Sequence, residues 1–200
     1  AELRRTRRHL AGLTARARWL RGERGPDLLE FCQRELDQLA HADYSDSLWL
    51  TWCCAGYYLE QGEPAQGLEL LNRLPASENW PGSFFWLQGA LLRALGRLPE
   101  AEKSLLSGLE PKVERNASEE VELLLELAIV QVLLGHSADQ QGRWLDQAVG
   151  RAHEVGDLDL LAEIEWVRGL IHEVQHDMGA ALRSYQRVIE VSSPGSRWRA

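Results

Sequence analysis

Residues 83–111 constrain the fold of this chain most strongly, because their glycines and prolines divide them into two short amphipathic helices. Gly96 marks the end of the first helix and Pro99 the first turn of the second, since proline fits a helix only there. Gly89 and Ala101 place small side chains where the two helices are expected to cross. The segment therefore predicts a helical hairpin.

Residues 50–75 show the same pattern 34 positions earlier in the chain. Gly62 aligns with Gly96 without a gap, and the small and large residues of the two segments then coincide. The other aligned pairs are Ala55 with Gly89, Gly67 with Ala101 and Leu71 with Leu105. A fixed period of this kind predicts a helical-repeat architecture, in which stacked hairpins bury one continuous core.

The later part of the chain keeps the pattern with a longer period. Gly135 follows Gly96 by 39 residues, and the turn at His176 and Asp177 follows Gly135 by 41 residues. His176 stands where a turn glycine is expected. The crossing positions of this last unit are filled by Gly169, Ala181 and Tyr185.

These hairpins resemble the tetratricopeptide repeat (TPR), which has small residues where its helices cross and a large residue late in the second helix. Residues 116–192 are similar to the roughly forty-residue repeats of large ATP-dependent bacterial transcription activators of the maltose-activator type. The resemblance implies an all-α fold, a right-handed α-solenoid of about five antiparallel helix pairs that binds proteins or peptides on its concave face.

Prolines and capping residues predict the boundaries of the repeats. We expect one TPR-like domain over residues 1–192 and a tail over residues 193–200. The expected hairpins cover residues 3–40, 45–75, 81–110, 117–155 and 158–191. None of the seven prolines needs to lie inside a helix, and no segment alternates as a β-strand would. The apolar run over residues 121–134 is expected to be the most buried helix.

Residues 3–20 predict a basic amphipathic helix. Its expected apolar side contains Leu3, Leu10, Leu13, Ala17 and Leu20. We interpret it as the terminal cap of the solenoid, with arginines keeping the outer face solvated. Contact of these arginines with phosphates or an anionic membrane is the alternative.

The distribution of charge disfavours a nucleic-acid-binding body. Residues 1–24 contain eight arginines and two glutamates, whereas the remaining chain carries a net charge of −14. A strongly acidic surface repels a phosphate backbone. We therefore expect no direct binding of nucleic acid by the solenoid.

Cysteine use and hydropathy favour a soluble, cytoplasmic protein. Cys32 stands alone, and Cys53 and Cys54 are adjacent, so their spacing fits neither a zinc site nor a redox pair, and buried reduced thiols are expected. No signal peptide is apparent, and the longest apolar run contains charged residues, so no membrane contact is expected. Because the chain begins at Ala1, we expect it to be part of a longer protein.

Residues 172–176 have the sequence HEVQH, which matches the HExxH motif. In zinc peptidases this spacing puts two imidazoles on one helical face with a glutamate as general base. Here the repeat alignment gives His172 a packing role and places His176 in a turn, away from His172. We interpret the motif as a coincidence, and we expect no metal, no cofactor and no catalytic activity.

Three tryptophans occupy equivalent repeat positions. The turn alignment pairs Trp52 with Trp86, and Gly169 as the crossing residue brings Trp166 to the same place. In TPR arrays this position faces the concave groove, so the resemblance implies a partner-binding stripe of tryptophans with Arg93 nearby. A register shift of one residue would instead bury these tryptophans in the core.

We expect a protein- or peptide-binding scaffold, used as a sensing or assembly module of a larger bacterial transcriptional regulator. One alternative is a free-standing TPR adaptor or chaperone. The alternative from another class is a zinc metallopeptidase that uses His172, Glu173 and His176. The sequence indicates neither the partner nor the oligomeric state.

Overall fold

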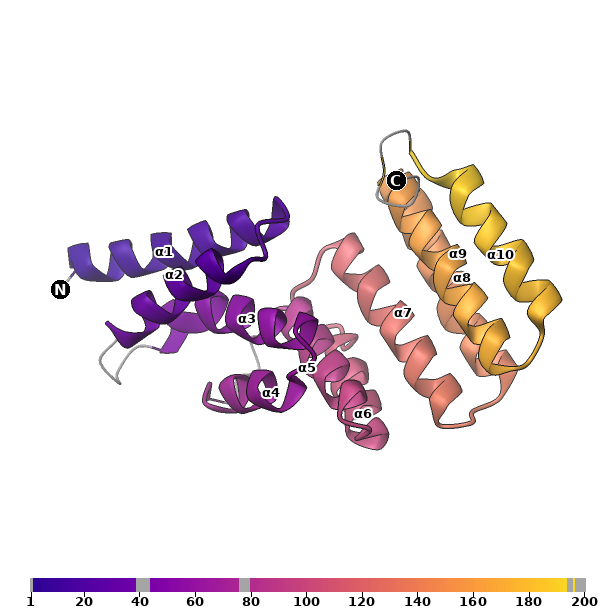
Figure 1. Cartoon of the computed structure of the whole chain (residues 1–200), viewed down its shortest axis with the longest axis horizontal. Coiled ribbons are helices and arrows are strands. Elements are labelled where there is room, and N and C mark those ends of the chain that lie inside the picture. Colours follow the sequence, from indigo (N-terminus) through magenta and orange to yellow (C-terminus); the bar gives the residue numbers. More distant parts are fainter. Residues whose placement is uncertain (1, 39–43, 76–79, 194–195, 197–200) are drawn as a thin grey trace. The chain divides into compact units, whose positions relative to one another are not determined.

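A computed structural model describes residues 2–38, 44–75, 80–193 and 196 of the protein. These residues form ten α-helices and no strand, which confirms the all-α class (Figure 1). The helices are α1 (Glu2–Leu20), α2 (Pro26–Asp37), α3 (Tyr44–Glu60), α4 (Pro64–Asn72), α5 (Gly82–Ala94), α6 (Leu98–Gly108), α7 (Ala117–Leu133), α8 (Ala138–Val155), α9 (Leu158–Val174) and α10 (Met178–Val191). Most of the expected tail, residues 194–195 and 197–200, lies outside the described residues.

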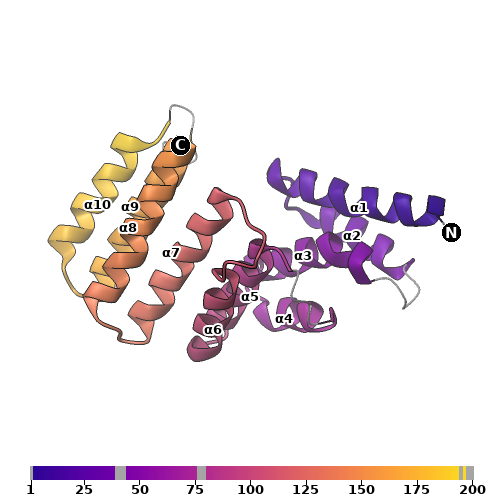
Figure 2. The same cartoon turned by 180° about the vertical axis from the view of Figure 1, so that it is seen from behind.

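The chain divides into two compact units. The first comprises Ala1–Glu78 and Ala90–Gly96, and so contains α1 to α4 with the end of α5. The second comprises Asn79–Gly89 and Arg97–Ala200, and so contains the start of α5 with α6 to α10. Within the second unit, α7, α8, α9 and α10 pack in chain order, each against the next, as both views show (Figures 1 and 2).

Proline and left-handed turns set the helix boundaries. Pro26 and Pro64 are the first residues of α2 and α4, and Pro99 is the second residue of α6. Five turns after helices contain a glycine with positive φ: Gly22, Gly62, Gly96, Gly135 and Gly156. His176 has a φ of 62° after α9, which confirms that it replaces the turn glycine there.

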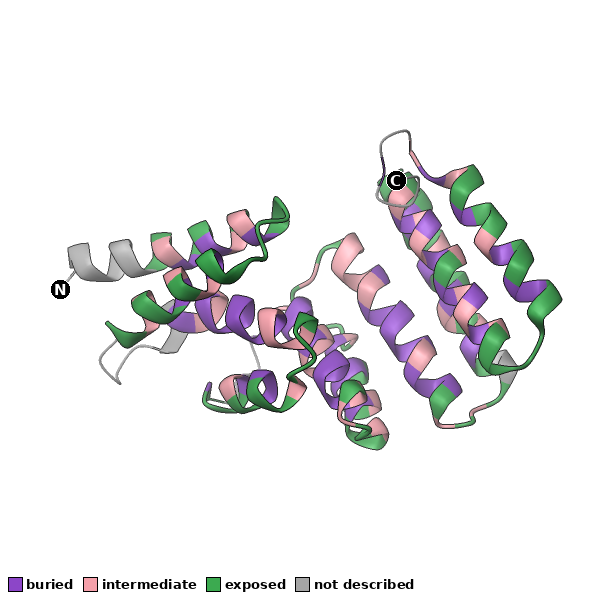
Figure 3. Ribbon diagram, in the orientation of Figure 1, coloured by how far each residue is buried: buried purple, intermediate pink, exposed green. Residues whose placement is uncertain are grey.

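The core of the second unit is centred on α7, as predicted from its apolar run. Ten residues of α7 are buried (Figure 3). Five of them pack with apolar side chains of α8 and α9: Val121, Leu124, Leu125, Ala128 and Val132. A capping box starts the helix: Asn116 Oδ1 accepts from the Glu119 amide at 2.9 Å, and the Glu119 carboxylate accepts from the Asn116 amide at 3.0 Å. This box fixes where α7 begins.

Gln131 interrupts the apolar run of α7 and is buried. Its side-chain amide donates to Glu102 on α6 at 2.8 Å, and its oxygen accepts from the Trp144 indole on α8 at 2.9 Å. Because a buried polar group is costly without partners, these two bonds explain why a glutamine is tolerated here.

The face of α1 that packs differs from the predicted one. Leu10, Leu13 and Leu20 are exposed, at 56%, 41% and 70%, whereas the side chain of Leu3 lies outside the description. Among residues 9–20 of α1, the buried positions are Gly12, Ala15 and Trp19. The Trp19 ring fills the space above Gly56 of α3, where an added Cβ would lie 2.7 Å from it. The helix therefore packs on α3 through the large Trp19 ring, which fits against Gly56, and not through its row of leucines.

The helices cross at the small residues that the repeat alignment identified. A Cβ added to Gly67 of α4 would lie 2.8 Å from the backbone oxygen of Ala55 on α3. A Cβ added to Gly169 of α9 would collide with the ring of Tyr185 on α10. Since helices can approach this closely only through glycine or alanine, the alignment of these positions is confirmed.

Candidate binding site

Trp52, the first tryptophan of the predicted stripe, lies in a packed aromatic cluster of the first unit. It is on α3 and only 7% exposed. Its ring meets Trp19 of α1 edge-on at a centroid distance of 5.4 Å and Trp49 at 6.0 Å. The Arg16 guanidinium lies 3.9 Å from the centroid of Trp49. Trp52 therefore contributes mainly to the packing of α1 on α3.

The other residues of the predicted binding stripe are more exposed to solvent than Trp52. Trp86 and Arg93 are half-buried on α5, and Trp166 on α9 is 38% exposed. The structure does not bring all four residues into one unit, because Trp52 and Arg93 belong to the first and Trp86 and Trp166 to the second. Among the three tryptophans, Trp166 has the largest exposed fraction.

Trp166 is part of an apolar stripe on α9. Leu170 is half-buried and Val174 is exposed, and both follow Trp166 at intervals of four residues. Side chains four residues apart lie on the same side of a helix, so the three form one row. We call Trp166, Leu170 and Val174 the α9 stripe. A row of this kind is the surface that a helix offers to an apolar segment of a partner.

The HExxH residues lie at the end of α9 and just beyond it. His172 is in the last turn of the helix, which ends at Val174, and His176 follows in the left-handed turn. Burial raises the pKa of Tyr185, and the nearby Glu173 raises it further. A zinc site of this motif needs both imidazoles on one continuous helix, and here the helix ends between them. Among the described residues, no group of three His, Cys, Asp or Glu side chains could hold a metal ion.

A second surface feature is a pocket of about 240 Å³ in the first unit. Its lining comes from three helices: Gln33 and Leu36 of α2, Cys54 and Tyr58 of α3, and Gln66, Glu69, Leu70 and Arg73 of α4. Gln33 donates to the Tyr58 hydroxyl at 3.2 Å, and Arg73 pairs with Glu69 at 2.7 Å. The pocket thus combines a polar rim with apolar lining, and the Cys54 thiol reaches it.

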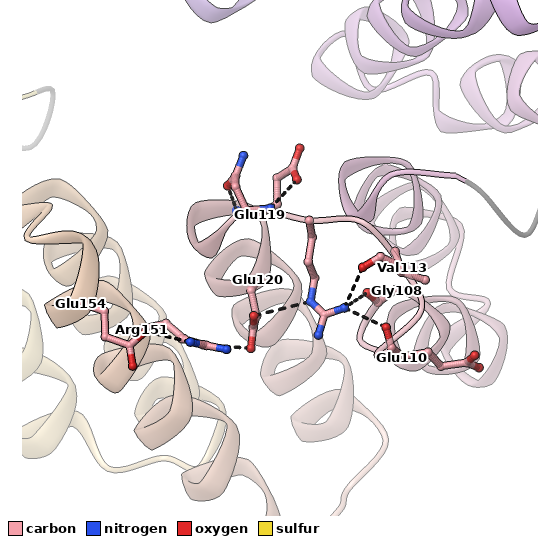
Figure 4. Close-up of polar contacts among 9 residues, drawn as sticks. Gly108, Glu110, Val113, Glu119, Glu120, Arg151 and Glu154 are labelled. Atoms are coloured by element: carbon pink, nitrogen blue, oxygen red, sulfur yellow. Dashed lines mark hydrogen bonds and ion pairs between the residues drawn. The ribbon is translucent and has the colours of Figure 1, made fainter.

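Arg115 is a third candidate because its side chain is largely buried. Figure 4 shows the polar contacts around it that involve Gly108, Glu110, Val113, Glu120, Arg151 and Glu154. Its Nη1 donates to three backbone oxygens around the end of α6, those of Gly108, Glu110 and Val113. Its Nε lies 3.5 Å from Glu120 of α7, and Glu120 also pairs with Arg151 of α8 at 3.2 Å. Arg151 in turn pairs with Glu154 at 2.7 Å. These contacts connect the end of α6 with α7 and α8.

Sequence reasoning missed both the α9 stripe beyond Trp166 and the pocket. Leu170 and Val174 follow Trp166 at helical spacing, so the stripe was detectable from the pattern, although their exposure was not. The pocket residues come from three helices. No spacing along the chain predicts that Gln33, Tyr58 and Arg73 surround one space.

The paired helices, the left-handed turns and the small crossing residues define a TPR-like helical-repeat fold. Among solved structures, TTC0263, described as a thermophilic TPR protein in Thermus thermophilus, is similar to this chain with a TM-score of 0.67 and 19% identity, over 92% of this chain and 90% of that one. MamA is similar with a TM-score of 0.57 and 12% identity, over 88% of this chain and 93% of that one. At these identities the likeness establishes the fold alone.

No family model matches the sequence, and a search of curated proteins also finds no match. In the part of the chain that the structure describes, no helix has both the length and the hydropathy needed to span a bilayer.

Proposed function

We propose that this chain is a scaffold that binds an apolar segment of a protein or peptide partner. The observation that supports the proposal is the α9 stripe, in which Trp166, Leu170 and Val174 form one accessible row on a TPR-like repeat. Rigid aromatic side chains with large apolar area dominate the energetics of protein interfaces. Trp166 is therefore the proposed anchor.

We propose Trp86, in the same unit as Trp166, as a second contact residue, because it occupies the position of Trp166 in its own repeat. Arg93 is a separate proposed contact of the first unit, since a planar guanidinium is the group that pairs best with a carboxylate. Trp52 has a supporting role in this proposal, since a side chain that is 7% exposed offers little contact area. We assign no catalysis, no metal and no cofactor to the chain.

Isolation of a cross-linked partner, followed by calorimetric titration of that purified partner, tests the proposal. We expect Trp166→Ala to weaken binding at least about tenfold, the loss typical of an interface anchor. The matched control is Leu106→Ala, which removes an apolar side chain of similar exposure from α6. Equal affinity of both variants would refute the assignment of Trp166, and stoichiometric zinc in the purified protein would refute the absence of a metal.

We further propose that residues 1–192 act as one module of a larger cytoplasmic regulator of bacterial transcription, with residues 193–200 as a tail. Support comes from the long period of residues 116–192, which is similar to the repeats of the maltose-activator type. The net charge of −14 outside residues 1–24 favours a protein partner over nucleic acid. A DNA-binding helix-turn-helix in the flanking sequence would support this context, and its absence would favour a free-standing adaptor or chaperone.

A further inference from the structure

The first helix, α1, exposes a row of apolar side chains to solvent. Leu10, Leu13 and Leu20 are each at least 41% exposed, and Ala17 between them is exposed as well. Residues three, four and seven positions apart lie on one side of a helix, so the four form one row. We call Leu10, Leu13, Ala17 and Leu20 the α1 row. It extends over about 15 Å of the helix axis.

The last helix, α10, exposes a second apolar row of nearly the same length. Met178, Leu182 and Ile189 are 58%, 59% and 60% exposed. Successive members are four and seven residues apart, so they lie on one side of α10 and extend over about 17 Å of its axis. We call these three residues the α10 row. It contains none of the residues of the α9 stripe.

The α1 row occupies positions that the next repeat buries. Aligning the left-handed glycine turns that follow α1 and α3 pairs Leu10 with Leu50 and Leu13 with Cys53. Leu50 is completely buried and Cys53 is 2% exposed. Both point at least about 140° away from Ala55, where α3 crosses α4, and α3 also packs against α1 and α2. The α1 row is therefore the surface that a preceding hairpin would cover.

The α10 row includes a position that the preceding repeat covers. α8 and α10 are the second helices of their hairpins, and aligning their first residues pairs Ile189 with Val149. Val149 is partly buried against a core cluster to which the following helix, α9, contributes. The α10 row is therefore the surface that a following hairpin would cover.

Charge favours contact between an α1 row and an α10 row over contact between two like rows. Residues 1–24 carry a net charge of +6, whereas residues 157–193 contain seven acidic and three basic residues, a net charge of −4. Opposite charges attract the two surfaces, and like charges would oppose contact of α1 with α1 or of α10 with α10. A first helix packed on the second helix of another hairpin is also the arrangement of α9 on α8.

We propose that copies of this chain associate head to tail, with the α1 row of one copy packed on the α10 row of the next. The repeat stacking then continues from one chain into another. Because the two rows are different surfaces, the contact is heterologous, and the copies form an open chain or a closed ring. One helix row on each side buries less area than a standard interface, so we expect a dissociation constant on the order of 10 μM.

Substitutions at exposed positions of each row test the proposal. Leu13→Asp blocks the α1 row, Leu182→Asp blocks the α10 row, and Leu106→Asp, at a similarly exposed position of α6, is the matched control. Sedimentation velocity follows each protein from well below to well above the expected dissociation constant. The unmodified chain and the control should form species larger than the monomer as the concentration rises. Each blocked variant should associate at least about tenfold more weakly, because aspartate would place a charge in an apolar contact.

A mixture of the two blocked variants separates head-to-tail contact from the alternatives. One variant keeps its α10 row and the other its α1 row, so the mixture should form a one-to-one dimer that does not grow. Leu20→Asp and Ile189→Asp repeat the test at a second position of each row, and melting temperatures check that every variant is folded.

Three results would overturn the proposal. Dimers of the Leu182→Asp variant alone would show contact between two α1 rows, and dimers of the Leu13→Asp variant alone would show contact between two α10 rows. The third is an unmodified chain that stays monomeric at every concentration. If that monomer binds phosphatidylserine vesicles and Leu13→Asp abolishes the binding, the α1 row is a membrane contact instead.

Discussion

Gly89 of α5 and Leu105 of α6 touch where the two helices cross. A Cβ added to Gly89 would lie 2.6 Å from Cγ and from Cδ2 of Leu105, closer than real atoms of this kind approach. Gly169 and Tyr185 repeat this relationship in α9 and α10. The size of one residue in each hairpin therefore sets how closely its two helices pack.

Gly89→Ala is expected to lower the free energy of unfolding by about 1–2 kcal/mol, because the strain of overpacking exceeds the gain in helix propensity. Thermal or urea unfolding measures this change. The control is Gly150→Ala on α8, where an added Cβ meets nothing within 4 Å, so a gain of about 0.5–1 kcal/mol is expected. In a Leu105→Ala background the loss at Gly89 should disappear, and its persistence would show that the two residues are not coupled.

Ala101→Arg is expected to be among the most damaging single substitutions. Ala101 is completely buried on α6, so the new side chain would overpack the site and bring in an unpaired charge. We expect a loss of about 3 kcal/mol or more in the free energy of unfolding. Ala94→Arg, at an exposed position of α5, should change it by less than about 0.5 kcal/mol. Similar melting temperatures for the two variants would contradict the packing role of Ala101.

His176→Gly is expected to stabilise the protein by about 0.5–1 kcal/mol, because His176 has a φ of 62°, which glycine adopts without strain. The reverse change at an equivalent turn is Gly156→Ala, where φ is 71° and an added Cβ has open space around it. There we expect a loss of about 1 kcal/mol from backbone strain alone. If His176→Gly lowers the melting temperature, the imidazole makes a contribution beyond the turn.

Trp52→Ala and Trp166→Ala are expected to differ in how much they lower the free energy of unfolding. Trp52→Ala should cost about 3–5 kcal/mol, because Trp52 is 7% exposed and packs between Trp19 and Trp49. Trp166→Ala, at 38% exposure, should cost less than about 1.5 kcal/mol. Melting temperature and partner affinity measured on the same variants separate packing from binding. A large loss of stability at Trp166 would mean that it is a packing residue as well.

Arg115→Ala is expected to cost about 2–3 kcal/mol, since it leaves backbone oxygens around the end of α6 without their donor and Glu120 without its buried partner. Arg151→Ala is the matched control, because this arginine pairs with the same Glu120 from a more exposed position. Its loss should be below about 1 kcal/mol. Equal losses in chemical denaturation would show that the backbone bonds of Arg115 contribute little.

The features that could be predicted from the sequence depend on residues that lie close together along the chain. Proline at a helix start, glycine at positive φ and the size of the crossing residues depend on positions close together in the chain or one hairpin apart. The sequence was therefore sufficient for the approximate helix ends, the turn at His176 and the position of Gly169 as a small crossing residue. It also identified α7 as a buried helix, because a run that is apolar nearly all round has no face suited to water.

The tertiary structure alone decided which face of each helix is buried. The leucines of α1 predicted one packing face, but Gly56 of α3 offers space for Trp19, so α1 packs through another. Trp52 and Trp166 occupy aligned positions, yet Trp52 is 7% exposed and Trp166 is 38% exposed. The sequence pattern of one helix shows that the helix has an apolar side. Which of its side chains become buried depends on the shape of the helix that packs against it.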